Sequence, residues 1–219
     1  GLGDVYKRQV IVPGYAKSAG TIMTMAADEI LMGENSALGP IDAQISSQGK
    51  VFSAEAFLEG MEKIKREVTQ TGTLNKAYIP VLQSISPGEL QAAENALNFA
   101  KVLVTEWLAK FKFKTWIKHS STGVDVTPEE RTKQAESIAK QLCNHSRWLT
   151  HGRSLGRDRL EEMGLKITTY GADDLGDAIR RYYTLLQMTF ATNIYKLFET
   201  PDSHIMRFIA PQTPRIFHA

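Results

Sequence analysis

Ser18 is the residue of this chain whose type and surroundings are suited to nucleophilic chemistry. It follows the uninterrupted apolar run of residues 10–12, which predicts a buried strand ending at Pro13. Small residues after Ser18 lead into the apolar spacing of a helix that packs on a sheet. Ser18 is therefore predicted at a helix N-terminus, where free N–H groups favour a developing oxyanion. Serine is also a common N-cap, so a purely structural role stays open.

Three short pieces of sequence around Ser18 resemble the nucleophile region of the Clp protease/crotonase superfamily. They are Ser18-Ala19-Gly20, residues 26–30 (AADEI) and residues 38–42 (LGPID). The stretch is most similar to the serine dehydrogenase proteinase and signal peptide peptidase A families. This resemblance implies an α/β fold, with a short parallel sheet wrapped by helices. It also implies a serine endopeptidase in which Ser18 attacks the peptide carbonyl and the Ala19 N–H binds the oxyanion.

Lys76 is one of two candidates for the base that takes the proton of Ser18. The loop of residues 71–76 and the helix that follows resemble the segment of signal peptide peptidase A that carries its catalytic lysine. A lysine accepts this proton only if burial or nearby positive charge lowers its pKa from about 10.4 towards neutrality. A loop lysine is otherwise a solvated surface charge.

His151 is the second candidate base. It precedes residues 155–167, which resemble the late helix and Gly-Leu element of the superfamily. In Clp protease the triad aspartate comes from just before this element, and the triad histidine from a region that reads GPIDAQ here. Asp42 in that region is a candidate to orient the base or contact the substrate backbone, although such a turn also simply ends a strand. Of the five histidines, only His151 is predicted near the site; the others are His119, His145, His204 and His218.

Composition is consistent with one globular domain. The chain has 219 residues, 42% of them hydrophobic, and a net charge of +2, which gives no electrostatic footprint for nucleic acid. Residues 110–121 interleave lysines with aromatic residues, a pattern of nucleic-acid or membrane surfaces but more often of an exposed flank or an edge against a partner subunit. The single cysteine, Cys143, excludes an intrachain disulfide and a cysteine-based metal cluster. No cofactor or metal is expected.

The chain is predicted to have three parts. Residues 1–9 match nothing that follows and are expected to be a non-native or scar segment. Residues 10–200 are expected to form the peptidase domain, truncated at its N-terminus because the resembled families have an upstream βα unit with a second oxyanion donor. Within it, helices are predicted over residues 51–68 and 174–198, and from capping boxes at Ser86 and Thr127. Residues 201–219 form a tail, without an element pattern from Met206 onwards.

The predicted function is hydrolysis of peptide bonds through an acyl-enzyme on Ser18, with a peptide or protein substrate. The resemblance implies a homo-oligomer, and membrane association through an N-terminal segment that precedes this sequence. No signal peptide and no apolar stretch of about 18 residues is visible, so a cytoplasmic or membrane-associated location is expected. Without the upstream unit this chain is expected to be nearly inactive. Two alternatives stay open, a crotonase-type acyl-CoA enzyme and an inactive scaffold of the same fold.

Overall fold

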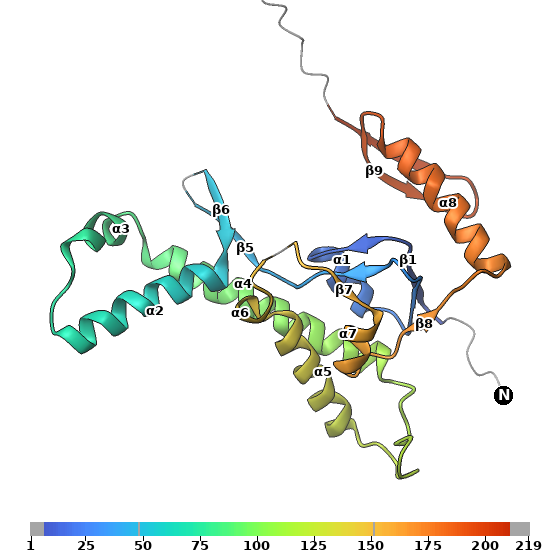
Figure 1. Ribbon diagram of the computed structural model, residues 1–219, viewed down its shortest axis with the longest axis horizontal. Coiled ribbons are helices and arrows are strands. Elements are labelled where there is room, and N and C mark those ends of the chain that lie inside the picture. The colour runs from blue at the N-terminus through green and yellow to red at the C-terminus, as the bar shows by residue number, and fades with distance from the viewer. Residues whose placement is uncertain (1–6, 48, 151, 211–219) are drawn as a thin grey trace, which may run out of the picture. The chain divides into compact units, whose positions relative to one another are not determined.

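A parallel sheet lies at the centre of the fold, as predicted. The computed structural model describes residues 7–47, 49–150 and 152–210. The strand β1 (Gln9–Val12) pairs in parallel with β3 (Glu29–Met32), and β8 (Thr168–Thr169) pairs in parallel with the other edge of β3. The helix α1 (Ala19–Met25) connects the first two strands (Figure 1). This arrangement confirms the α/β class and the short parallel sheet with helices packed around it.

A second, smaller sheet joins three segments that are far apart in sequence. The strand β2 (Tyr15–Ala16) pairs in parallel with β4 (Ala37–Leu38), and β4 pairs in antiparallel with β7 (Leu155–Gly156). The two residues of β2 precede Ser18 almost directly. The sheet therefore brings the chain around residue 155 to the segment that enters the candidate nucleophile turn.

The helical prediction for residues 51–68 is shifted along the chain. Residues 50–53 form the strand β6 (Lys50–Ser53), which makes an antiparallel hairpin with β5 (Gln44–Ser47). The helix α2 (Ala54–Thr71) begins only after Ser53, whose hydroxyl accepts a hydrogen bond from the Ala56 N–H. The N-cap at Ser53 thus sets the start of the helix, and the β-branched and aromatic residues before it favour the strand.

The remaining elements of the first part of the chain are mostly helical. Both predicted capping boxes are confirmed, with Ser86 paired to Glu89 and Thr127 paired to Glu130. The elements are η1 (Lys76–Tyr78), α3 (Ile79–Gln83), α4 (Pro87–Trp107), η2 (Leu108–Lys112), α5 (Pro128–Leu142), α6 (His145–Trp148) and α7 (Arg157–Glu162).

The chain splits into two compact units, residues 1–169 and 170–219. The second unit contains α8 (Asp174–Phe190) and an antiparallel hairpin of β9 (Ile194–Glu199) and β10 (Ile205–Ile209). The helix predicted to reach residue 198 is wrong after Phe190, and β10 lies where no element was predicted.

Aromatic pairs across the hairpin explain this difference. The ring of Phe208 lies 6.2 Å from that of Tyr195 and 6.1 Å from that of Phe198, centroid to centroid. Such cross-strand pairs stabilise strands but come from residues distant in sequence. The division at residue 169 falls inside the predicted 10–200 domain, whose extent as a functional unit stays a prediction, as does the origin of residues 1–9.

The hydrophobic core of the first unit is built by both sheets and by the helices α1, α4, α5 and α7. Cys143 belongs to it, and burial raises the pKa of its thiol to about 12, so it is the small buried hydrophobe that its sequence context indicates. Side chains that are completely or almost completely buried include Met25, Ile30, Met32, Leu38, Val104, Leu108, Ile138, Leu142, Leu155, Leu160 and Leu165.

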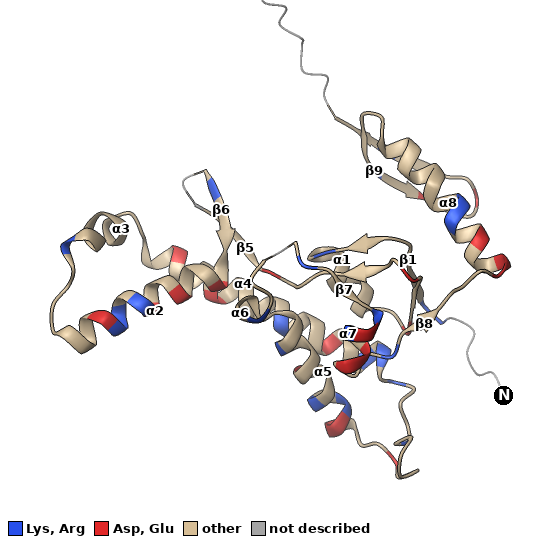
Figure 2. Cartoon of the chain, in the orientation of Figure 1, with Lys and Arg blue, Asp and Glu red and all other residues tan. Residues whose placement is uncertain are grey.

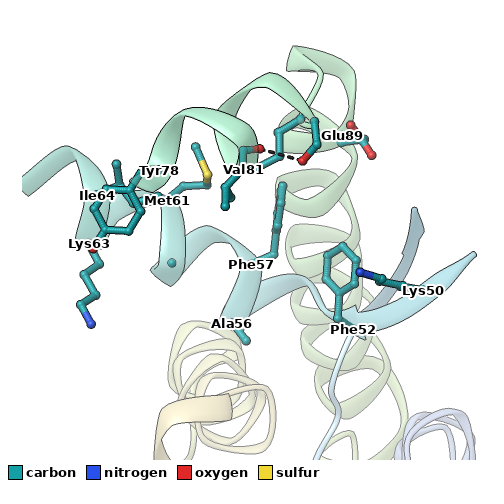
Figure 3. Close-up of a pocket in the computed structure, with 13 residues that line it drawn as sticks. Lys50, Phe52, Ala56, Phe57, Met61, Lys63, Ile64, Tyr78, Val81 and Glu89 are labelled. Carbon is teal, nitrogen blue, oxygen red and sulfur yellow. Dashed lines mark hydrogen bonds between the residues drawn. The ribbon is translucent and has the colours of Figure 1, made fainter. Parts of the chain in front are cut away.

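The helices α2 and α3 extend away from the parallel sheet (Figure 1). Charges of both signs lie along α2, and its residues Lys63, Lys65 and Arg66 are exposed (Figure 2). The opposite face of α2 lines a cavity of about 460 Å³ with β6 and α3, where Phe57 and Met61 point towards Val81 (Figure 3).

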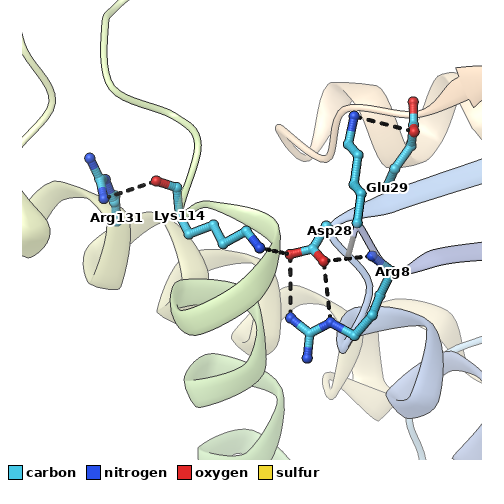
Figure 4. A network of polar contacts seen from close by, with 6 residues as sticks. Arg8, Asp28, Glu29, Lys114 and Arg131 are labelled. Carbon is cyan, nitrogen blue, oxygen red and sulfur yellow. Dashed lines mark hydrogen bonds and ion pairs between the residues drawn. The ribbon is translucent and has the colours of Figure 1, made fainter. Parts of the chain in front are cut away.

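Asp28 lies between α1 and β3, and its buried carboxylate is held by two cations (Figure 4). Its side chain is 1% exposed, and its oxygens lie 3.2 Å from Arg8 Nε and 2.8 Å from Lys114 Nζ. Burial alone would raise the pKa of Asp28, but hydrogen bonds from Arg8 and Lys114 hold it far below the usual range. Beside it, hydrogen bonds from Thr168 and Gln9 lower the pKa of Glu29 to about 2. Both carboxylates therefore stabilise the fold in their ionised forms.

These pKa shifts predict loss of stability in acid. A carboxylate whose pKa is lowered on folding contributes fully above its unfolded pKa, near 4, and this contribution is lost as the pH falls towards the folded value. We expect Asp28→Asn to lower the free energy of unfolding at pH 7 by about 1–3 kcal/mol and to flatten its decline between pH 5 and 2. Chemical denaturation followed by circular dichroism measures both effects.

The matched control is Asp158→Asn, because Asp158 also pairs with an arginine but its side chain is 86% exposed. An exposed ion pair contributes little to stability, so this variant should follow the wild-type curve at every pH. Identical pH curves for the two variants would contradict the role assigned to Asp28.

Candidate active site

Ser18 has a strained backbone conformation. Its φ of 51° and ψ of −113° are rare for a residue with a side chain, and its hydroxyl makes no capping hydrogen bond to α1. The alternative that Ser18 is an ordinary N-cap therefore does not describe this turn. A half-buried serine on a strained turn between a strand and a helix is the geometry of a nucleophile elbow.

Thr21 and Gly39 hold this turn in place. The buried Thr21 hydroxyl lies 2.9 Å from the Ala16 carbonyl oxygen and 2.8 Å from that of Gly39, and it accepts the Gly39 N–H at 3.2 Å. Gly39 has no room for a side chain, because an added Cβ would lie 2.7 Å from Lys17 Cγ and 3.2 Å from Lys17 Cα. These contacts fix the residues on both sides of Ser18, and such surroundings allow a strained conformation to persist.

The backbone N–H of Ala19 is available to a ligand. In this turn the Gly20 N–H donates to the Lys17 carbonyl at 2.9 Å, and the Ile22 N–H donates to the Ser18 carbonyl at 3.0 Å. Within the described part of the chain, the Ala19 N–H has no such acceptor, and Ala19 is exposed. Its predicted part in an oxyanion hole is thus compatible with the geometry.

The loop before β7 returns to the Ser18 turn. Lys17 Nζ donates a hydrogen bond to the Gly152 carbonyl oxygen at 2.6 Å, across 135 positions of sequence. Pairing of β7 with β4 holds the same loop from its other end. His151, one of the two candidate bases, lies outside the described residues, but its neighbour Gly152 contacts the residue that precedes Ser18.

Asp42 lies beside His145, a histidine that was not predicted near the site. The Asp42 side chain is 5% exposed, and its Oδ1 lies 3.6 Å from Nδ1 of His145, the first residue of α6. The Ile41 N–H donates to the Leu142 carbonyl at 2.9 Å, which joins this turn to the end of α5. His145 was not predicted to lie near the site, but helix packing brings it to Asp42, one of the candidate site residues.

No periodicity or motif in the sequence marks His145 as a functional residue. Its one local signal is Asn144 before it, which caps α6 by accepting the Arg147 N–H at 2.7 Å. The His145 N–H donates to Glu55 Oε2 at 2.7 Å, which connects α6 to the start of α2. The position of the imidazole thus depends on contacts that span about ninety positions of sequence, and these are invisible to a local pattern.

Lys76 lies at the far end of α2 from β6. It opens η1, is exposed, and its side chain makes no hydrogen bond or ion pair with any described residue. The 18 residues of α2 span about 27 Å, so η1 is separated from the small sheets by a helix length. The structure does not bring Lys76 and Ser18 together, and its catalytic role stays a prediction.

The residues that the structure describes contain neither a candidate membrane-spanning helix nor a candidate metal-binding cluster. No helix among these residues is both long enough and apolar enough to span a membrane. No group of three or more His, Cys, Asp or Glu side chains in the same residues is arranged to hold a metal ion.

Comparison with known proteins supports the sequence resemblance. Residues 4–83 match the model of a family described as ClpP-like SDH-type serine proteinase. Two proteins of Methanocaldococcus jannaschii, both described as uncharacterized, are similar over most of this chain. The first is 28% identical over 182 residues, which cover 83% of this chain and 47% of that protein. The second is 27% identical over 180 residues, which cover 82% of this chain and 48% of that protein.

The chain therefore spans about half the length of the curated relatives it matches. No solved structure matches it significantly. The matched family segment runs from the residues before β1 through α3, and it contains Ser18, Ala19, Asp42 and Lys76. The segment of residues 4–83, which contains the strained serine between strand and helix, is thus similar to the ClpP-like SDH-type serine proteinase family.

Proposed function

We propose that this chain is the catalytic part of a serine endopeptidase and that Ser18 is its nucleophile. The observation that carries the proposal is the backbone of Ser18, which is strained and whose hydroxyl makes no cap. Strain of this kind costs about 1–3 kcal/mol and tends to occur at functional sites. The family match over residues 4–83 supports a serine proteinase at the level of the family.

In this proposal, Ser18 Oγ attacks the carbonyl carbon of a peptide substrate. A base takes the hydroxyl proton and returns it to the leaving amine, and water then hydrolyses the acyl-enzyme. The Ala19 N–H donates to the oxyanion of the tetrahedral intermediate. The positive end of α1 adds to this stabilisation, because the N–H groups of its first turn point towards the same side. The proposed substrate is a peptide or protein, and the similarity to this family supports assembly into a homo-oligomer as part of the proposal.

We propose His151 as the base, with Lys76 as the alternative. Support for His151 comes from the bond between Lys17 Nζ and the Gly152 carbonyl, which brings the chain next to residue 151 to the Ser18 turn. Lys76 is exposed and remote by comparison, because it lies beyond the far end of α2. Asp42 is proposed to orient an imidazole, since its carboxylate is buried and lies next to the imidazole of His145.

The first prediction concerns the nucleophile. Ser18→Ala in the full-length protein should lower peptide turnover by several orders of magnitude and abolish covalent labelling by a fluorophosphonate probe. The matched control is Ser86→Ala, because Ser86 also directly precedes a helix but, unlike Ser18, caps it through the capping box of α4. The control should lose about 1 kcal/mol of stability and keep both turnover and labelling. Turnover that survives in Ser18→Ala would refute the assignment.

The second prediction ranks the candidate bases. His151→Asn should abolish turnover, whereas Lys76→Met should leave it near the wild-type value. His145→Asn separates the two histidines, and it should have the smaller effect if His145 only packs against Asp42. Turnover should rise with pH through an apparent pKa near 6.5 if a histidine is the base, and through a higher value if a lysine is. Loss of turnover in Lys76→Met alone would move the assignment to the lysine.

The third prediction tests the strain at Ser18 independently of activity. Glycine adopts positive φ without a steric cost, so Ser18→Gly should be more stable than Ser18→Ala by about 1 kcal/mol. Thermal unfolding of the two variants measures the difference. Ser36 provides the comparison, because its φ is not positive, and there the glycine variant should be the less stable of the two. Equal stability of the two Ser18 variants would show that the turn is not strained.

A further inference from the structure

A lysine-rich pocket lies at the opposite edge of the parallel sheet from Ser18. Its volume is about 740 Å³, and we call it the amino-edge pocket because it includes Glu29 and Thr168, which begin β3 and β8. The other walls come from the end of η2 and the loop after it, with Lys112, Phe113 and Trp116, and from Lys166 before β8. Parallel strands run in one direction, so this edge is remote from the turn that follows the carboxyl end of β1.

Lys112 is the unusual residue of this pocket. It is the last residue of the π-helix η2, and it is 9% exposed. Its amine has no hydrogen bond or ion pair with any residue in the described ranges. Residues 110–121 were expected to form an exposed flank or an edge against a partner subunit, but Lys112 and Phe113 are both buried in this chain. Burial of a cation without a partner is unfavourable, so this environment favours a bound anion.

The two carboxylates that line the pocket are already engaged. Asp28 is held by Arg8 and Lys114, and Glu29 pairs with Lys7 at 3.4 Å and accepts the Thr168 hydroxyl at 2.6 Å. Lys118 and Lys166 add two exposed cations to the walls. The pocket thus has a surplus of positive charge. Burial lowers the pKa of Lys112 to about 8, and Glu29 nearby opposes this shift while Lys166 adds to it.

Two aromatic rings provide an apolar wall beside this charge. Phe113 and Trp116 line the pocket with their ring centroids 5.8 Å apart and their planes tilted by 58°. Phe113 is buried and Trp116 is partly buried against the core. Pockets that bind small molecules combine such apolar walls with a few convergent polar groups. The combination favours a ligand that has both an anionic group and an apolar body.

We propose that the amino-edge pocket binds a small organic oxyanion, whose carboxylate or phosphate pairs with the Lys112 ammonium and whose apolar part lies against Phe113 and Trp116. This site is distinct from the one proposed at Ser18, and it does not depend on peptidase activity. Lys118 and Lys166 attract the anion towards the entrance, while Lys112 provides the desolvated contact. Such a charge-assisted hydrogen bond is stronger in a buried site than in water.

Binding of the anion is linked to a proton. A negative charge beside Lys112 raises the pKa of its amine, so the complex takes up protons near pH 8 and affinity falls above that pH. The charged groups that face Lys112 are Lys7, Asp28, Glu29, Lys118 and Lys166. Hydrogen bonds hold the pKa values of Asp28 and Glu29 well below this range, so both carboxylates stay ionised while Lys112 titrates.

The test is calorimetric titration of the 219-residue chain with benzoate, inorganic phosphate and benzamide. Benzamide matches benzoate in shape without its charge, so we expect benzoate to bind and benzamide not to bind. Lys112→Met keeps the length and apolar stem of the side chain and should weaken benzoate binding at least tenfold. Lys110→Met is the matched control, because Lys110 lies in the same π-helix but is exposed and outside the pocket, and it should bind as wild type.

Nuclear magnetic resonance of ¹³C-lysine-labelled protein adds a readout that does not need the variant to fold. The pKa of the Lys112 signal should be lowered in the unbound protein and should rise when benzoate or phosphate is added. The stronger of the two ligands identifies the oxyanion as a carboxylate or a phosphate. Equal affinity of Lys112→Met and wild type, equal binding of benzamide and benzoate, or an absence of saturable binding by both anions would overturn the proposal.

Discussion

The close contact between Gly39 and Lys17 is the constraint on which the candidate active site depends. Because Gly39 has no side chain, β4 can lie against the backbone of the residue just before Ser18. The Thr21 hydroxyl then reaches the backbone of both Ala16 and Gly39, which fixes α1 relative to the small sheet. With both of its ends fixed in this way, the turn holds Ser18 in a conformation that it would not adopt alone.

The parallel sheet separates two kinds of chemistry. Past the carboxyl end of β1 lie the strained serine and the Ala19 N–H, a small arrangement made largely of backbone. At the amino ends of β3 and β8 lie buried charges, among which Asp28 and Glu29 are neutralised by neighbouring cations while Lys112 is not. A buried charge is stable only with a partner, so the engaged carboxylates contribute to the fold and the solitary amine favours a ligand.

Contacts over long sequence distances decide which groups lie next to the candidate site residues. The Gly152 carbonyl reaches Lys17, and His145 reaches Asp42, through the packing of α5, α6 and β7 onto the N-terminal strands. Lys76 occupies an exposed turn after a long helix that extends away from the sheet. His145 and Lys76 are both polar residues near turns in the sequence. The placement of the helices that precede them decides that His145 lies beside Asp42 while Lys76 is exposed.

The sequence by itself determined the first strand of the central sheet, α1, both capping boxes and the position of Ser18 between strand and helix. These features depend on apolar runs, on prolines and on residues within three or four positions of one another, so local patterns are sufficient to predict them. Only the tertiary structure decided the strain at Ser18, the pairing of Asp42 with His145, the hairpin of β9 and β10 and the burial of Lys112. Each of these depends on side chains that meet across many positions of sequence, and no local pattern contains the energy of those contacts.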